Sequence, residues 1–284
     1  MHLIINADDF GSSASVNEAV YLAHTRGVLT SASWMATGQA AGEAVALARG
    51  MPTLAVGLHL VLVKGQPALP PREIPHLVDP AGRFPNDPML AGLRLALNPA
   101  AQTELERELR AQFERFAATG LALDHVDSHL HFHVHPSVFP RVVELARQYG
   151  ACGLRLPRDD LLLAWSGRPG EKALKVFFTL IFALFYRRYR PAAQRLNLFL
   201  PERAFGLLNS GRMEEVYVLN LLLRAQVGTA EVYFHPSSRL GSESLGPNPG
   251  DLATLLSEPV RDAIRQRGIR LTTYTALARL ANAG

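Results

Sequence analysis

Near its start the chain reads Leu3-Ile4-Ile5-Asn6-Ala7-Asp8-Asp9-Phe10-Gly11, an apolar run that ends at two adjacent carboxylates. Apolar runs also end at His59, His129, Arg155 and His235. In parallel α/β proteins the ligand-binding side chains come from the carboxyl ends of the strands. The placement of these polar residues therefore predicts strands that belong to one sheet and share one site.

Six strand-like runs each follow an amphipathic segment that stops at a glycine. Glycine just beyond a helix can take the left-handed conformation that closes the last turn. Alternation of helices with apolar strands predicts a parallel sheet that is buried on both faces. The six predicted joints are Gly27 before Val28–Met35, Gly50 before Leu54–Leu62, Gly120 before Leu121–Val126, Gly150 before Leu154–Leu156, Gly228 before Glu231–Phe234 and Gly268 before Ile269–Tyr274.

The predicted fold is an α/β, TIM-barrel-like (β/α) barrel, regular or distorted, because ligands from at least four strands must converge on one point. An open doubly wound sheet is the alternative. The composition shows no break, so residues 1–284 are expected to form a single domain. The proline-rich stretch Pro67–Pro88 predicts a long loop, and residues 157–212 predict an insertion between two βα units.

The composition is that of an ordinary globular protein, with 48% hydrophobic and 19% charged residues. Lys and Arg outnumber Asp and Glu by 29 to 25 without forming an aromatic-interleaved basic stripe, so no nucleic-acid partner is expected. Cys152 is the single cysteine, which excludes a cysteine-rich zinc site. No signal-peptide pattern opens the chain, and a cytoplasmic location is expected.

The adjacent carboxylates Asp8 and Asp9 suit a divalent cation with a base beside it. Consecutive side chains on an extended strand point to opposite sides, so one carboxylate can bind the ion while the other reaches the attacking water. The alternative is a simple turn in which Asp9 caps the next helix. His59, inside the apolar run Ala55–Leu62, is either a ligand or a hydrogen-bonded core residue. Gly57 permits a close approach of another backbone or a bulge.

The segment Asp127–His135 carries four alternating histidines. On an extended chain they would share one face, but successive rings lie about 6.5–7 Å apart, so they do not all bind one ion. We expect His129 to be a ligand, with His131 and His133 lining the pocket or supporting the ligands. Asp127 is expected to orient one of the rings. A ligand pair formed by His129 and His133 is the competing assignment.

Two later residues complete the candidate site. His235 can act as the general acid that protonates a leaving group, or it can be structural. Arg155 can hold the base carboxylate or a substrate oxygen, and a surface salt bridge is the alternative. No nucleophile elbow, P-loop or dinucleotide-binding fingerprint occurs in a strand–helix context, which disfavours serine hydrolases, NTPases and dinucleotide enzymes.

Taken together, these motifs resemble the YdjC-like carbohydrate deacetylase family. The resemblance covers nearly the whole chain and rests on Asn6–Gly11, Val56–His59, Asp124–His129 with His131 and His133, and Phe234–Pro236. It implies a TIM-barrel-like fold, one divalent metal ion (magnesium or zinc) and removal of acetyl from N-acetylated sugars. It matches Asp9, His59 and His129 to metal ligands and Asp8 to the catalytic base. His235 matches the late His-Pro position, where we expect the acid.

Within that family the chain most resembles the branch associated with hopanoid biosynthesis, through Gly57–Pro67, Leu77–Asp79 with Gly82–Phe84, and Phe205–Leu207. That branch implies deacetylation of an N-acetylglucosaminyl hopanoid glycolipid. The eleven residues Val176–Tyr186 are apolar except for Thr179, and Arg187–Arg190 follow. They are too few to span a bilayer, which takes about 17–25 residues. Residues 174–190 are therefore expected either to touch the inner face of a membrane peripherally or to form a buried helix.

The sequence thus predicts a metal-dependent amidohydrolase that acts on linear amides, a carbohydrate N-deacetylase with an acetylated, lipid-linked aminosugar as substrate. One rival is a soluble chitooligosaccharide deacetylase. The other is a non-catalytic sugar- or lipid-binding barrel that keeps a metal for stability.

Overall fold

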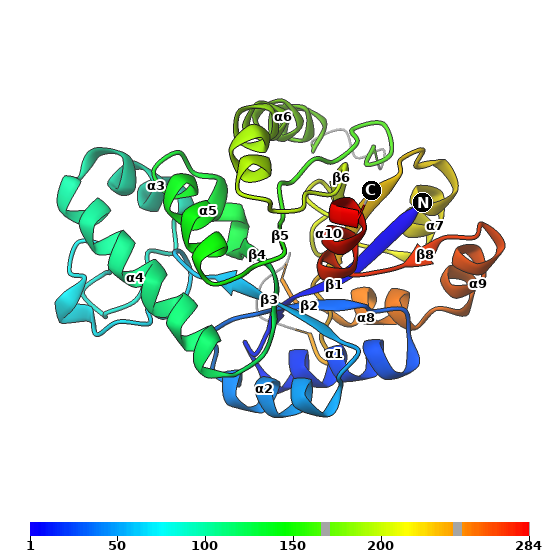
Figure 1. Ribbon diagram of the computed structural model, residues 1–284, viewed down its shortest axis with the longest axis horizontal. Coiled ribbons are helices and arrows are strands. Elements are labelled where there is room, and N and C mark those ends of the chain that lie inside the picture. The colour runs from blue at the N-terminus through cyan, green and yellow to red at the C-terminus, as the bar shows by residue number, and fades with distance from the viewer. Residues whose placement is uncertain (166–170, 241–245, 284) are drawn as a thin grey trace.

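The computed structural model describes residues 1–165, 171–240 and 246–283. Eight strands form a single sheet in which every named pair of strands is parallel. Helices surround this sheet (Figure 1). The strands are β1 (His2–Phe10), β2 (Ser31–Trp34), β3 (Ala55–Leu60), β4 (Leu123–Ser128), β5 (Gly153–Leu154), β6 (Arg203–Phe205), β7 (Thr229–Phe234) and β8 (Arg270–Leu271).

The sheet is a curled half-barrel, and the closed ladder of a TIM barrel is not formed among the described residues. The strand order is β5-β4-β3-β2-β1-β7-β6, with β8 paired to the first residues of β1. Isolated bridges connect each outer strand to chain near the other: Gly153 of β5 pairs with Phe199, and Arg158 pairs antiparallel with Ala204 of β6. Because β5 has only two residues and Pro157, which has no N–H to donate, follows soon after it, a regular β5–β6 ladder does not continue there.

The described helices pack on the outside of the sheet, and none of them is long and apolar enough to cross a bilayer. Two short 3-10 helices, η1 (Pro71–Glu73) and η2 (His129–Val134), lie in connections. The α-helices are α1 (Ala14–Arg26), α2 (Ala41–Gly50), α3 (Pro88–Leu97), α4 (Pro99–Ala118), α5 (Phe139–Gln148), α6 (Lys172–Arg195), α7 (Glu215–Arg224), α8 (Pro249–Leu256), α9 (Glu258–Gln266) and α10 (Tyr274–Ala283).

The predicted alternation of helices and strands is confirmed, since a strand lies at each of the six glycine-marked joints. Gly120, Gly150 and Gly268 adopt the left-handed conformation expected beyond a helix, with φ of 71°, 75° and 60°. The predicted insertion over residues 157–212 holds α6 and the short strand β6, so it is part of the repeat rather than an addition to it. Residues 166–170 within it lie outside the described residues.

The sequence suggested that Gly57 permits the close approach of another backbone. In the structure Gly57, in β3, makes room for a side chain instead. A Cβ at this position would lie 2.4 Å from Cε1 of His125, which projects from the neighbouring β4. The predicted irregularity is also present, because the β3–β4 register shifts between Val56 and Leu58. The absence of a side chain at Gly57 thus lets β3 and β4 pair closely beside the candidate site.

We expect the substitution Gly57→Ala to destabilise the protein by about 1–3 kcal/mol, because the buried His125 ring must shift to admit the methyl group. Gly50→Ala is the matched control, since nothing lies within 4 Å of its added Cβ and the residue is helical. Urea unfolding midpoints measure both effects. Equal midpoints for the two variants would show that the contact with His125 is not tight.

Candidate metal centre and active site

At the carboxyl end of β1, the carboxylates of Asp8 and Asp9 contact different partners. The register of β1 with β2 shifts between Ala7 and Phe10, and Asp9 has a left-handed φ of 62°. This local turn, in addition to strand alternation, separates Asp9 from Asp8. The capping alternative for Asp9 is wrong, because Ser13 caps α1 by accepting a hydrogen bond from the N–H of Val16.

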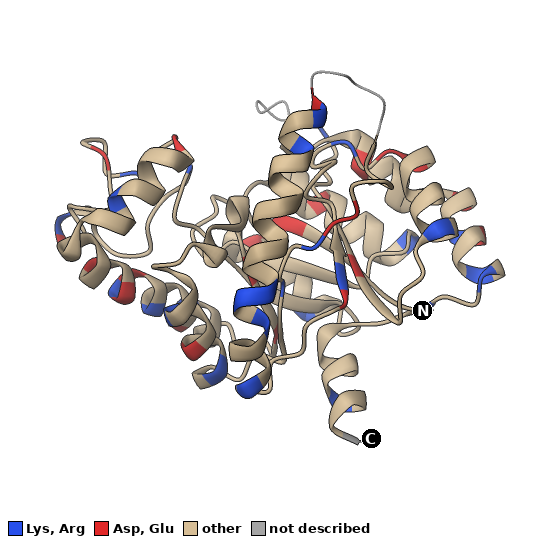
Figure 2. Cartoon of the chain, turned by 90° about the horizontal axis from the view of Figure 1, so that it is seen from above, with Lys and Arg blue, Asp and Glu red and all other residues tan. Residues whose placement is uncertain are grey.

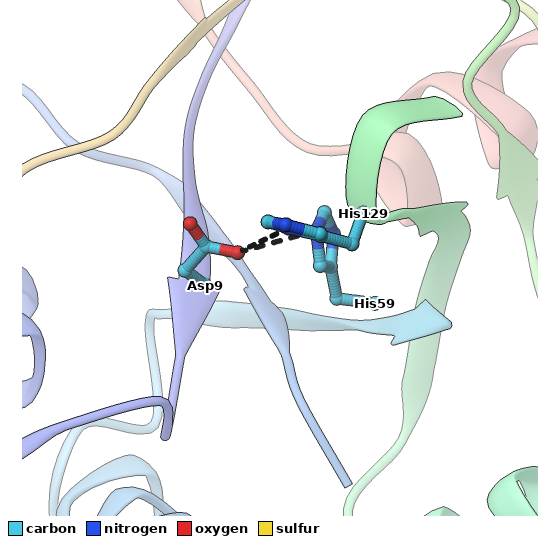
Figure 3. Close-up of side chains that lie close together, drawn as sticks. All are labelled: Asp9, His59 and His129. Carbon is cyan, nitrogen blue, oxygen red and sulfur yellow. Dashed lines mark hydrogen bonds and ion pairs between the residues drawn. The ribbon is translucent and has the colours of Figure 1, made fainter. Parts of the chain in front are cut away.

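Asp9, His59 and His129 form a compact cluster from three different elements, β1, β3 and η2 (Figure 3). Oδ1 of Asp9 lies 3.4 Å from Nε2 of His59 and 3.2 Å from Nδ1 of His129. One ligand atom from each residue lies within 4.8 Å of the others. Asp9 and His59 are buried, whereas 15% of the His129 side chain is exposed. The cluster can therefore hold a metal ion that remains open to solvent on the His129 side.

The bonding of His59 fits a metal ligand. Its Nδ1 lies 2.8 Å from Oδ1 of Asp127, and its Nε2 is buried with no hydrogen-bond partner among the described residues. A carboxylate that accepts from one ring nitrogen leaves the lone pair of the other free for an ion, which is a common arrangement around metal-binding histidines. Asp127 thus orients the ring of His59, a candidate ligand.

A second possible ligand set consists of Asp8, His59 and Asp127. One ligand atom from each of these residues also lies within 4.8 Å of the others. It is less suited to an ion, because a guanidinium group of Arg155 already binds both of its carboxylates, at 2.8 Å from Asp8 and 2.6 Å from Asp127. Asp9 contacts no guanidinium in the described structure, so the set with Asp9 and His129 is the better candidate centre.

Neighbouring charges set the protonation of the cluster in the absence of an ion. Although burial opposes ionisation, His129 and His59 lower the pKa of Asp9. Burial also disfavours the charged ring of His59, but Asp127, Asp8 and Asp9 raise the pKa of His59 to about 9. Near neutral pH the ring of His59 is therefore cationic in the metal-free protein, and an incoming ion must displace one of its two ring protons.

Ion binding is consequently expected to release about one proton near pH 7. Because the pKa of His59 is raised to about 9, ion affinity should rise with pH, by about tenfold per unit, and level off above that value. Titration calorimetry in two buffers of different ionisation enthalpy measures the proton count. Binding with no proton release and no pH dependence would contradict the role of His59.

Arg155 is the centre of a buried ionic network, so the surface salt-bridge alternative is wrong. Its side chain is 0% exposed and holds Asp8 through two parallel hydrogen bonds of 2.8 Å. Its Nη1 lies 2.6 Å from Asp127, and its Nη2 lies 2.8 Å from Glu231. Despite burial, these carboxylates raise the pKa of Arg155. Three buried carboxylates thus share one guanidinium, and this excess of negative charge favours a cation nearby.

Several members of this network were not predicted from the sequence. Glu231 in β7 is fully buried and accepts a hydrogen bond of 2.6 Å from the hydroxyl of Tyr274. Asn6 donates to Oδ1 of Asp8 at 2.8 Å and to Ser33 at the same distance. The available signal for Glu231 was a charged residue inside an otherwise apolar strand, which requires a buried partner.

The histidine-rich segment does not continue as a strand. It turns into η2, with left-handed φ values of 52° at Leu130 and 55° at His131. His133 bonds through both ring nitrogens, to Oγ of Ser128 and to the carbonyl of Arg155, each at 2.7 Å. Burial lowers its pKa to about 4. His133 therefore supports the site as a neutral ring, and the competing His129–His133 ligand pair is wrong.

His131 lies beside the centre without joining it. Its Nε2 is 2.8 Å from the hydroxyl of Tyr233, and its ring packs against Phe182 of α6. Burial, together with the charge of Arg155, lowers its pKa. Its Nδ1 is buried and finds no partner in the part of the chain that the structure describes. A pocket-lining or supporting role of His131 stays a prediction.

His235, just after β7, lies close to Asp8. Its Nε2 lies 3.8 Å from Oδ2 of Asp8, and 14% of its side chain is exposed. Its backbone N–H donates to Asp251 at 2.8 Å, which fixes the start of the loop. The structure therefore brings every predicted site residue to the same end of the sheet, with His131 and His133 at its border.

Comparison with known proteins agrees with this geometry. The YdjC-like protein family model matches residues 2–266. A carbohydrate deacetylase of Geobacillus stearothermophilus is 35% identical over 98% of this chain and 99% of its own length. A carbohydrate deacetylase of Brevibacillus brevis is 47% identical over 149 residues, which is 52% of this chain and 57% of that relative.

Among solved structures, a protein of Enterococcus faecalis V583 described as a cellobiose-phosphate cleavage protein superposes with a TM-score of 0.76. It is 29% identical, and the match covers 97% of this chain and 98% of that one. The similarity therefore extends over the whole fold as well as the motifs. This chain belongs to the YdjC-like protein family.

Proposed function

We propose that the protein is a metal-dependent carbohydrate deacetylase, a single domain over residues 1–284 that hydrolyses the N-acetyl group of an N-acetylglucosamine moiety. One observation carries the proposal: a three-residue cluster able to hold an ion, Asp9, His59 and His129, lies next to the carboxylate of Asp8, which Arg155 binds. The full-length similarity to a carbohydrate deacetylase supports the reaction type.

Asp9, His59 and His129 suit either magnesium or zinc, and the bound ion would polarise the acetamide carbonyl and activate water. Asp8 accepts the proton of the attacking water. In the described structure Asp8 accepts three hydrogen bonds, one from Asn6 and two from Arg155. An ionised carboxylate has about four acceptor sites, so one remains for water. His235, next to Oδ2 of Asp8, protonates the departing amine.

Arg155 and Asp127 position these groups. The two parallel hydrogen bonds from Arg155 fix the plane of the Asp8 carboxylate, and the hydrogen bond with Asp127 fixes the ring of His59. The neutral rings of His131 and His133 add no positive charge to the border of the site. The substrate amide therefore meets one base, one acid and an oriented ligand set.

As substrate we propose an N-acetylglucosaminyl hopanoid glycolipid, reached by peripheral contact of residues 174–190 with the inner face of the membrane. The similarity of Gly57–Pro67 to the hopanoid-associated branch supports this choice. The outer face of α6 supports it too, because Phe177, Leu180 and Leu184 are 56%, 67% and 64% exposed. Figure 2 shows α6 uncharged along its middle, with basic residues toward its ends.

Acetate release from a panel of acetylated aminosugar lipids and free chitooligosaccharides, followed by mass spectrometry, tests the proposal. We expect deacetylation of the lipid-linked sugar in the presence of magnesium or zinc, together with co-sedimentation with anionic vesicles. Release from soluble oligosaccharides alone, with the protein left in the supernatant, would favour the soluble deacetylase. Ion binding without any acetate release would favour the non-catalytic barrel.

A further inference from the structure

A cavity of about 570 Å³ lies outside the ionic centre, between residues 161–165, α6 and α7. Its wall has more apolar than polar surface: Leu163, Leu174, Phe178 and Val216 line it, together with charged residues such as Arg212 and Arg224. Its volume falls in the range of about 300–1,000 Å³ that is typical of small-molecule sites. None of the deacetylation steps uses this cavity.

Two connections join the cavity to the candidate active site. Phe178 of the cavity wall contacts Phe182, with ring centroids 6.3 Å apart, and Phe182 contacts His131 at 5.8 Å. His131 in turn bonds to Tyr233, whose ring stacks on the guanidinium of Arg155 at 4.2 Å. Ring contacts from Phe178 and Phe182 on α6, continued by His131 and Tyr233, thus lead from the cavity to Arg155, which binds Asp8.

The second connection runs through the chain after β6. Leu207 and Leu208 line the cavity, and the preceding Gly206 comes so close to Tyr233 that an added Cβ would lie 2.7 Å from its carbonyl oxygen. The buried carboxylate of Asp159 fixes this turn by accepting from the backbone N–H of Gly206 and Leu208, at 3.2 and 3.0 Å. The wall of the cavity is therefore tied rigidly to the wall of the site.

The two sides of α6 differ in their surroundings. Phe178, Phe182 and Phe185 recur at intervals of four and three residues, so they lie on one side, in ring contact with each other. Leu180 and Leu184 lie on the outer side, exposed to solvent. A row of half-buried aromatic rings that begins at the cavity presents a surface suited to hydrocarbon.

We propose that this cavity binds the apolar aglycone of the substrate, so that the enzyme selects aminosugars attached to a hydrophobic group. This inference rests on the proposed function, because it assumes that the sugar amide lies at Asp8 and the ion site. The sugar then lies at the active-site end of the row of aromatic rings. The hydrocarbon extends from there along Phe182 to Phe178 and Val216 in the cavity wall.

Methyl and octyl β-N-acetylglucosaminide, the latter below its micelle-forming concentration, test the inference in the absence of membranes. Each fully buried methylene contributes roughly a fourfold preference. With several methylenes buried, we expect kcat/KM for acetate release to be roughly tenfold to a hundredfold higher for the octyl glycoside. Calorimetry should show tighter binding of the octyl glycoside with a negative heat-capacity change.

Val216→Glu is the test variant, because Val216 lines the cavity and is 68% exposed, so the fold tolerates the change. A carboxylate there should bring the octyl-to-methyl ratio close to one, both in kcat/KM and in affinity. Leu223→Glu is the matched control on the same helix, since Leu223 is 51% exposed and does not line the cavity. It should keep the wild-type ratio.

A wild-type ratio near one, or equal ratios in the two variants, would overturn the aglycone site while leaving deacetylation of the sugar intact. Failure to release acetate from either glycoside would instead contradict the proposed function. In that event calorimetry still decides the inference: octyl glycoside binding that Val216→Glu removes supports it, and unchanged binding overturns it.

Discussion

Turnover of the Asp8→Asn variant is expected to fall by roughly 10²–10⁴-fold, because the general base that accepts the proton of water is lost. Ion binding should remain, since the proposed ligands are Asp9, His59 and His129. The fold should remain as well. Arg155 keeps two carboxylate partners, Asp127 and Glu231, and the asparagine can still accept a hydrogen bond from it.

Asp9→Asn is the informative contrast, because Asp9 lies 3.2–3.4 Å from both ligand histidines. It should lose both the ion and turnover, whereas Asp8→Asn loses turnover alone. Metal content by mass spectrometry and initial rates of acetate release measure the two properties separately. Near wild-type rates in Asp8→Asn would reject Asp8 as the base, and loss of the ion in that variant would assign it to the ligands.

The largest expected effect on stability comes from Arg155→Met. Removing the guanidinium leaves Asp8, Asp127 and Glu231 buried without their shared partner. Breaking a buried ion pair by deleting one member costs about 3–5 kcal/mol, because the remaining charge stays desolvated. Because three carboxylates lose their partner, we expect the cost of Arg155→Met to lie at the upper end of that range. We expect a large fall in Tm or a failure to accumulate as folded protein.

Arg147→Met is the matched control, because Arg147 forms an exposed ion pair with Glu144 at 2.9 Å. Exposed pairs contribute about 0–1 kcal/mol, so its stability should stay close to wild type. Differential scanning calorimetry in the presence of a chelator compares the two variants without a contribution from bound metal. Similar Tm values for both would mean that the buried network is not needed for folding.

Much of the fold could be predicted because the sequence patterns that mark its helices and strands each lie within a short stretch of the chain. Glycine stops, apolar runs and polar strand ends are each visible within about ten residues, and they located the helix-to-strand joints correctly. Strand ends also predicted that Asp9, His59 and His129 meet, since the carboxyl ends of parallel strands share one edge of the sheet. The sequence did not indicate that β5 would be too short for a closed ladder.

The rest depends on contacts that are distant in the chain. Arg155 and Glu231 are 76 residues apart, and neither position alone distinguishes a buried pair from an exposed one. The alternating histidines suggested a strand, but the left-handed residues Leu130 and His131 turn the chain into η2. Local alternation cannot show such a turn, because non-glycine residues rarely adopt that conformation.

The central claim is that Asp9, His59 and His129 hold a divalent ion without which the N-acetyl group is not cleaved. Chelator-treated protein titrated with zinc or magnesium, with acetate release from an N-acetylglucosaminide as the readout, tests it most directly. We expect no acetate release from the metal-free protein, a rise in release that ends at one ion per chain, and no rise in a His59→Ala variant. Undiminished release from the metal-free protein, or full activation of His59→Ala, would contradict it.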